Sequence, residues 1–95
     1  MSAYVILDMD IKDYAEFQRF MASIKSAMDK VGARYLARGV EHQVHEGDWW
    51  PRRIVLLEFP SMATWEAFYV SSACRELNRI KDSCNSARLV SVVGL

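Results

Sequence analysis

The sequence has no net charge, because its twelve basic residues equal its twelve acidic ones. A chain without a surplus of either sign has no overall field to draw it to nucleic acid or to an anionic membrane. No apolar stretch approaches the ~20 residues of a membrane span, and the first residues lack the basic and long apolar regions of a signal peptide. The sequence therefore predicts a cytoplasmic protein with neither a nucleic-acid nor a membrane partner.

Motifs of specific chemistry are scarce. The chain has neither a glycine-rich phosphate-binding loop nor a nucleophile elbow. Its two cysteines, Cys74 and Cys84, are expected in one helix about 15 Å apart, too far for a disulfide. We therefore expect both to be reduced thiols without a redox role.

The two histidines, His42 and His45, give a weak signal for a metal site. Their odd spacing sends them to opposite faces of a strand, and we find no carboxylate or cysteine nearby that completes a ligand set. Haem is disfavoured because a proximal histidine would be expected on a helix, whereas both histidines lie in a strand-like region. The sequence predicts no metal and no cofactor.

The composition is that of one folded domain. Of the 95 residues, 52% are hydrophobic and 25% are charged, which suits a globular chain large enough for one core but not for two. No segment is polar or repetitive enough to act as a linker. We predict a single domain over residues 1–95.

The first third of the chain predicts a strand and a helix. Strand-forming residues fill Tyr4–Asp10, and Asp13 with Glu16 makes a capping box for the helix that follows. Apolar residues then recur every three or four positions as far as Gly32, which is expected to end the helix. This helix face comprises Tyr14, Phe17, Met21, Ile24, Met28 and Val31.

The middle of the chain predicts three extended segments. Arg34–Arg38 and Glu41–Glu46 have the pattern of a hairpin divided by a glycine turn. After a loop at residues 48–52, the apolar run Arg53–Phe59 is the strongest strand prediction, and Pro60 ends it.

The last third predicts a helix and a final strand. Ser61 is expected to cap a helix that breaks near Ser71–Ser72 and resumes through Leu77 and Ile80, before a strand at Ala87–Val93. The resulting β-α-β-β-α-β order is the ferredoxin-like α+β arrangement, with an antiparallel sheet of four strands, or five if a short extra strand is present. Right-handed crossovers place both helices on one face of this sheet.

Both faces of the predicted sheet are apolar. Alternation along each strand assigns one row, such as Val55, Leu57 and Phe59, to the helices and leaves the other row outside. The outward set comprises Ile6, Leu36, Ile54, Leu56, Leu89 and Val93. Such a patch is larger than a soluble monomer usually exposes. We therefore predict a homodimer in which two sheets close face to face.

Four polar residues interrupt the predicted outward face, namely Asp8, Arg38, Glu58 and Ser91. Carboxylates in an apolar enclosure are costly unless they are paired. If these residues converge, they form either a compensated ion network or a site in which one carboxylate has a raised pKa. The pattern favours neither alternative.

Several motifs resemble the Domain of Unknown Function 1330 family over almost the whole chain. They are Tyr4-Val-Ile-Leu-Asp8, Arg34-Tyr-Leu-Ala-Arg-Gly39, Glu46-Gly-Asp-Trp49 and Glu58-Phe-Pro60. The resemblance implies a dimeric α+β barrel, and the activity of that family is largely unassigned.

The resemblance also points to individual residues. It matches Asp8, Arg38, Glu58 and Tyr69 to polar positions of the family pattern. The chain departs from that pattern at Val40, where the family commonly has a second glycine. A ligand shared with other family members therefore does not follow from the resemblance.

Two functions are compatible with the sequence. One is the binding or transformation of a small polar molecule between the sheets, with Glu58 or Asp8 as catalytic base and Arg38, Tyr69 and Ser91 as binding residues. The other is a non-catalytic dimerisation or interaction module without a small-molecule substrate. Whether the protein is an enzyme is left open.

Overall fold

The computed structural model describes residues 1–39, 41–72, 74–75 and 82–95. Its elements are β1 (Ala3–Ile11), α1 (Tyr14–Lys30), β2 (Arg34–Gly39), β3 (Ile54–Phe59), α2 (Met62–Tyr69) and β4 (Cys84–Val93). The strands form one antiparallel sheet in the order β2-β3-β1-β4. The predicted β-α-β-β-α-β order and antiparallel sheet are confirmed. In the described part of the chain, no helix is long and apolar enough to cross a membrane.

Helix α1 begins and ends where the sequence predicts. The side chain of Asp13 caps it by accepting a hydrogen bond from the backbone N–H of Glu16 at 3.1 Å. Gly32 follows the helix with φ of +75°, a conformation that only glycine adopts at little cost. Phe17, Ile24 and Met28 are buried along the predicted stripe. Tyr14, at the start of that stripe, is half exposed.

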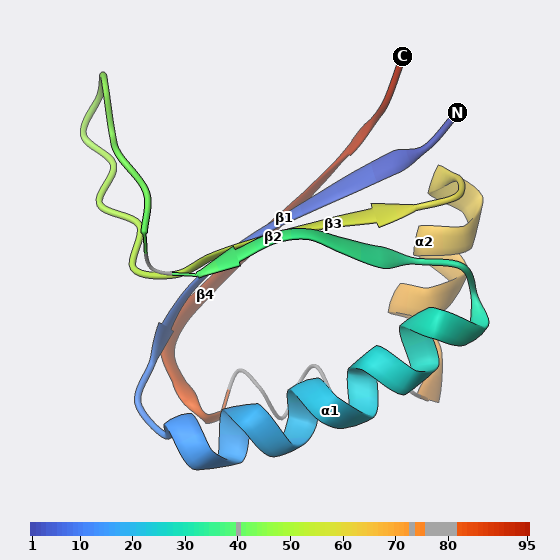
Figure 1. The fold of residues 1–95 in the computed structure, drawn as a ribbon, viewed down its shortest axis with the longest axis horizontal. Coiled ribbons are helices and arrows are strands. Elements are labelled where there is room, and N and C mark those ends of the chain that lie inside the picture. Colours follow the sequence, from blue (N-terminus) through green and yellow to red (C-terminus); the bar gives the residue numbers. More distant parts are fainter. Residues whose placement is uncertain (40, 73, 76–81) are drawn as a thin grey trace.

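Both α1 and α2 lie on the same side of the sheet, and the other side is open (Figure 1). The rows that face the helices are buried, as predicted: Val5, Leu7 and Met9 on β1, and Val55, Leu57 and Phe59 on β3. The side chain of Phe59 is fully buried, with ring centroids of Trp65 and Phe68 at 5.1 and 5.2 Å. This aromatic cluster joins α2 to the sheet.

The pairing of β2 with β3 contains a bulge at Leu36. Tyr35 lies opposite Leu57, but Ala37 lies opposite Leu56, so Leu36 is an extra residue on its strand. A bulge changes which side chains face each side of the sheet. Arg38 consequently lies opposite Val55, whose side chain faces the helices. The prediction that Arg38 lies on the outward face is therefore wrong.

The register of β4 also differs from the prediction. Ser91 lies opposite Val5 and Leu89 opposite Leu7, both on the helix side of the sheet, whereas Val90 lies opposite Ile6 on the open side. Leu89, Ser91 and Val93 were expected outward, and this expectation is wrong. The two alternating rows of β4 are almost equally apolar, so the sequence alone does not decide between them.

The predicted second strand of the hairpin, Glu41–Glu46, is absent. Residues 41–53, all of them described, contain no strand and instead form an arm that projects beyond the sheet (Figure 1). Glu41–Glu46 carries one apolar residue, Val44, so pairing this segment would bury little apolar surface. The described sheet has four strands, without the optional fifth.

Three further predictions concern the last third of the chain. Cys84 was expected in a helix but begins β4, because pairing with β1 extends as far as Ile11. The side chain of Ser61 caps α2, as predicted. The helix resumption through Leu77 and Ile80 lies outside the described residues.

Replacing Phe59 tests the aromatic cluster. Phe59→Ala is expected to lower the free energy of unfolding by about 3–5 kcal/mol, because it leaves a cavity between β3 and α2. Urea unfolding at fixed protein concentration measures this loss. The control Val70→Ala removes a side chain that is 78% exposed and should change stability by less than about 0.5 kcal/mol. Equal small effects of both variants would contradict the packing described above.

Candidate functional site

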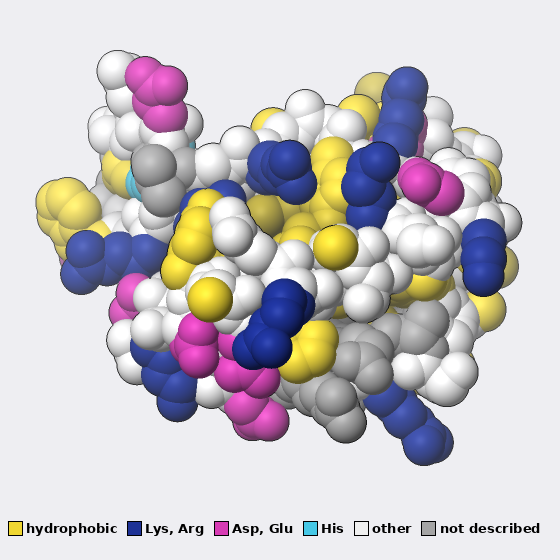
Figure 2. Space-filling model, turned by 60° about the horizontal axis from the view of Figure 1, so that its bottom comes forward, with side chains coloured by type: hydrophobic (Ala, Val, Ile, Leu, Met, Phe, Trp, Pro, Cys, Tyr) yellow, Lys and Arg dark blue, Asp and Glu magenta, His cyan; other side chains and the backbone are white. Residues whose placement is uncertain are grey.

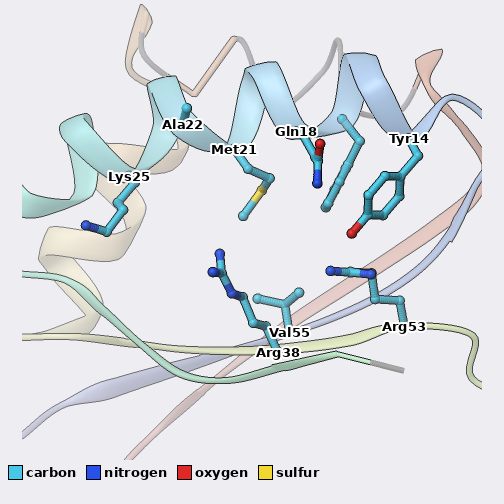
Figure 3. A pocket seen from close by; sticks show the side chains of 9 residues that line it. Tyr14, Gln18, Met21, Ala22, Lys25, Arg38, Arg53 and Val55 are labelled. Atoms are coloured by element: carbon cyan, nitrogen blue, oxygen red, sulfur yellow. The ribbon is translucent and has the colours of Figure 1, made fainter. Parts of the chain in front are cut away.

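A cavity of about 320 Å³ lies between α1 and the helix-facing side of β2 and β3. Helix α1 contributes Tyr14, Gln18, Met21 and Lys25 to its wall. The sheet contributes Arg38 from β2, Val55 from β3, and Arg53 from the residue just before β3. Figure 3 shows the guanidinium groups of both arginines reaching from the sheet toward the helix.

Arg38 reaches this cavity because of the bulge in β2. Its position opposite Val55 directs its side chain to the helix side, where the guanidinium carbon lies 5.3 Å from the centroid of the Tyr35 ring. A guanidinium over an aromatic face is attracted by the negative face of the ring. This contact with Tyr35 therefore helps to hold the guanidinium of Arg38, which lines the cavity.

Arg53 is held by two aromatic rings of α1. Its guanidinium carbon lies 5.4 Å from the ring centroid of Tyr14 and 5.5 Å from that of Phe17. Its Nε atom is buried and has no hydrogen-bond partner among the described residues. The charged group is therefore positioned by stacking, and its hydrogen-bonding capacity is not used within the described chain.

The electrostatics of the cavity are one-sided. Of the residues that the structure describes, three cationic side chains line it, Lys25, Arg38 and Arg53, and no carboxylate does. In the described parts of the chain, none of the three forms an ion pair with an acidic side chain. Figure 2 shows Lys and Arg side chains around exposed hydrophobic surface on the helix side of the molecule. This arrangement suits a ligand with both a negative and an apolar part.

The Tyr35 side chain does not line the cavity but contacts two residues that do, Arg38 and Met21. Burial raises the pKa of its hydroxyl above the usual value, while the nearby Arg38 acts in the opposite direction and Asp29 adds a smaller upward effect. The hydroxyl donates a hydrogen bond to Sδ of Met21 at 3.8 Å. Tyr35 therefore remains a phenol at neutral pH.

Glu58 lies on the open side of the sheet, away from the cavity. Its Oε1 accepts a hydrogen bond from Nε of Arg34 at 2.6 Å. The Glu58 side chain is 18% exposed, and the Arg34 side chain is 69% exposed. This hydrogen bond is the main cause that lowers the pKa of Glu58, with smaller contributions from Tyr4 and Ser2. The sequence left open whether Glu58 belongs to a compensated ion network or has a raised pKa. In the structure Glu58 is compensated by an ion pair, and its partner is Arg34 rather than Arg38.

Asp8 fixes the projecting arm. Its carboxylate accepts hydrogen bonds from the indole N–H of Trp49 at 3.1 Å and from the backbone N–H of Arg52 at 3.2 Å. Asp8 pairs with Ile54, whereas Glu58 pairs with Tyr4, four residues away along β1. At about 3.3 Å per residue, this separation is ~13 Å. The two carboxylates therefore do not converge, and their catalytic roles stay predictions.

The remaining two predicted binding residues lie elsewhere. Tyr69 ends α2 and is half exposed, with its ring centroid 5.4 Å from that of Trp65. Ser91 lies on β4, the edge strand farthest from β2 in the sheet order. Neither residue lines the cavity, and of the predicted site residues only Arg38 does. Among the described side chains, no group of three or more His, Cys, Asp or Glu is placed to hold a metal ion.

Comparison with known proteins decides the family. The family described as "Domain of unknown function (DUF1330)" matches residues 2–95 of this sequence. The chain belongs to the DUF1330 family. Among curated proteins, no sequence matches it significantly.

Three solved structures with a similar fold are distant in sequence from this DUF1330 chain. A protein of unknown function from Rhodopseudomonas palustris is 12% identical with a TM-score of 0.78, and the match covers 99% of this chain and 82% of that one. A protein from Jannaschia sp. CCS1, described as dimeric and ferredoxin-like, is 13% identical with a TM-score of 0.76 and coverage of 99% and 100%. The hydroxynitrile lyase from Passiflora edulis is 12% identical with a TM-score of 0.74 and coverage of 99% and 94%. At these identities the likeness shows the ferredoxin-like fold alone.

Sequence reasoning missed most of the cavity, although part of the signal was present. Arg53 lies two residues before Val55, so alternation along the strand puts both side chains on the same face. The row assigned to the helices therefore begins with a cation. Gln18 and Lys25 lie four residues after Tyr14 and Met21, so they run beside the apolar stripe of α1. Such a cavity is indicated when polar residues run beside the apolar stripe of a helix and a cation lies opposite them, in the row of strand residues that faces the helix.

Two arginine variants test the charge pairing on β2. Arg34→Gln is expected to raise the pKa of Glu58 back toward its ordinary value, while Arg38→Gln leaves that pKa unchanged. NMR titration of the Glu58 carboxyl carbon measures both. Because the pKa in the folded protein is lowered, the stability from this pair is present above the ordinary pKa and is lost as pH falls through the folded value. A rise on replacing Arg38 instead would contradict the bulged register.

Proposed function

We propose that this chain is a homodimeric cytoplasmic protein that binds a small polar organic molecule in the cavity between α1 and the sheet. The cavity carries this proposal. Its volume, about 320 Å³, lies at the lower end of the range for small-molecule pockets, about 300–1,000 Å³. Such pockets combine an apolar lining with a few converging polar groups, as this one does.

The lining supports binding more directly than it supports a particular reaction. Met21 and Val55 provide apolar contact, and the side chains of Gln18 and Tyr14 point toward the two arginines from the helix (Figure 3). The cavity lies within one subunit, on the helix side of the sheet, so each subunit of the dimer has its own. The sequence instead indicated a site between the sheets, around Asp8 and Glu58.

The homodimer is supported by the open side of the sheet. Apolar side chains from three strands lie there, namely Tyr4, Ile6, Ile54, Leu56, Val90 and Val92. Val90 and Val92 are more than half exposed, and they belong to an edge strand with no charged residue after Arg88. Long apolar edges and faces are normally covered. The similar protein from Jannaschia sp. CCS1 is described as dimeric.

The arm gives this proposed interface a second component. Asp8 holds its base through Trp49, while the Trp50 side chain remains 82% exposed. Tryptophan is enriched at the centres of protein interfaces because it buries a large area at low entropic cost. In the proposed dimer, the arm of each subunit therefore extends the contact made by the sheets.

A charged substitution tests the dimer. Leu56→Arg places a cation in the middle of the open face and should convert the dimer to a monomer, because the charge would be buried without a partner. Size-exclusion chromatography with light scattering at micromolar concentration measures the mass. The matched control Val70→Arg lies outside the sheet and should remain dimeric. A wild-type monomer at this concentration, with folded structure intact, would contradict the proposal.

A fragment panel tests the cavity. Fragments of neutral, anionic and cationic type are added to protein carrying labelled methionine methyl groups, and binding should shift the resonance of Met21. Ala22 lines the cavity, so Ala22→Trp should fill it and abolish these shifts. Ser23→Trp, on the neighbouring exposed position, should leave them unchanged. If no fragment of any charge shifts Met21 in the folded dimer, the alternative of an interaction module without a small-molecule ligand is the better description.

A further inference from the structure

We propose that the ligand of the cavity is a small organic acid, whose carboxylate binds between Arg38 and Arg53 while its apolar part packs on Met21 and Ala22. This inference rests on the proposed function, because it names the class of molecule for the same cavity. The family itself is described as a domain of unknown function.

The first support is the spacing of the two arginines. Arg38 lies opposite Val55, and Arg53 precedes Val55 by two residues, so the arginines are diagonal neighbours on one face of adjacent strands. Side chains in that relation start about 7–8 Å apart. Two guanidinium groups at this spacing can both donate hydrogen bonds to one carboxylate placed between them.

The second support is that the arginines lack acidic partners within the described chain. Arg34 is neutralised by Glu58 at 2.6 Å, but Arg38 and Arg53 contact aromatic rings instead. The buried Nε of Arg53 has no hydrogen-bond partner in the described residues. Two neighbouring cations repel each other beside a low-dielectric surface, and a bound anion removes that repulsion.

The third support distinguishes an organic acid from an inorganic anion. Phe17 and Val55 form the floor of the wall and are already buried in the core, so the apolar surface that the cavity exposes comes from the partly buried Met21 and the exposed Ala22. A phosphate ion would satisfy the arginines but leave this apolar surface in contact with water. A carboxylate attached to a compact apolar body covers both parts of the wall.

Three probes of one shape and different charge test the inference. Benzoate, benzamide and benzamidinium are titrated into the wild-type dimer at fixed ionic strength, with the Met21 methyl resonance and calorimetry as readouts. Benzoate should bind at least 10-fold more tightly than the other two. Inorganic phosphate and acetate carry the negative charge without the apolar ring, and each should bind at least 10-fold more weakly than benzoate.

Variants assign the binding to the two arginines. Arg38→Gln and Arg53→Gln should each weaken benzoate binding about 10-fold to 100-fold, as expected for the loss of a hydrogen bond between charged groups. Arg38 is exposed, so its replacement should leave the fold intact even if that of Arg53 does not. The control Arg19→Gln removes an exposed arginine of α1 that does not line the cavity and should leave the affinity unchanged.

The outcomes separate this inference from the proposed function. If neutral fragments shift Met21 while benzoate has no advantage over benzamide, the ligand class is wrong and the cavity proposal stands. Phosphate binding as tight as benzoate, or benzoate binding that is insensitive to both arginine variants, would also overturn the inference. If neither the fragments nor the benzoate series affects Met21, both proposals fail together.

Discussion

The extra residue at Leu36 determines on which side of the sheet Arg38 lies. The bulge keeps Arg34 opposite Glu58 on the open side of the sheet and brings Arg38 opposite Val55 on the helix side. With regular alternation, both arginines would share one face. The inserted residue therefore separates an arginine that neutralises an acid from an arginine that faces a cavity.

The two sides of the sheet consequently have different chemistry. The open side is apolar, and its Glu58 is compensated by Arg34 with a lowered pKa, so the carboxylate adds little unpaired charge to a surface proposed to meet a second subunit. The helix side combines apolar walls with Arg38 and Arg53, which stack on aromatic rings. Asp8 belongs to neither set, since its hydrogen bonds hold the arm at Trp49.

Much of this fold could be predicted from the sequence because its signals are local and periodic. The cap at Asp13, the stripe of α1 and the buried row of β3 follow from spacing and residue type alone. The faces of β4 could not be predicted, since both of its rows are apolar and only pairing with β1 distinguishes them. The position of Arg38 depends on a bulge that alternation does not reveal. The position of Arg53 on the helix side, by contrast, could have been predicted, because Arg53 lies two residues before Val55 and shares its face of the strand.

The position of the Arg38 side chain tests the bulge, and with it the candidate site, most directly. Nuclear Overhauser spectra of protein with labelled methyl groups report which methyl protons lie near the δ-methylene protons of Arg38. The bulged register predicts cross-peaks to the methyl groups of Val55, which lies opposite Arg38 on the helix side of the sheet. Without the bulge Arg38 would lie opposite Ile54, so cross-peaks to the methyl groups of Ile54 instead would place Arg38 on the open side and contradict the cationic cavity.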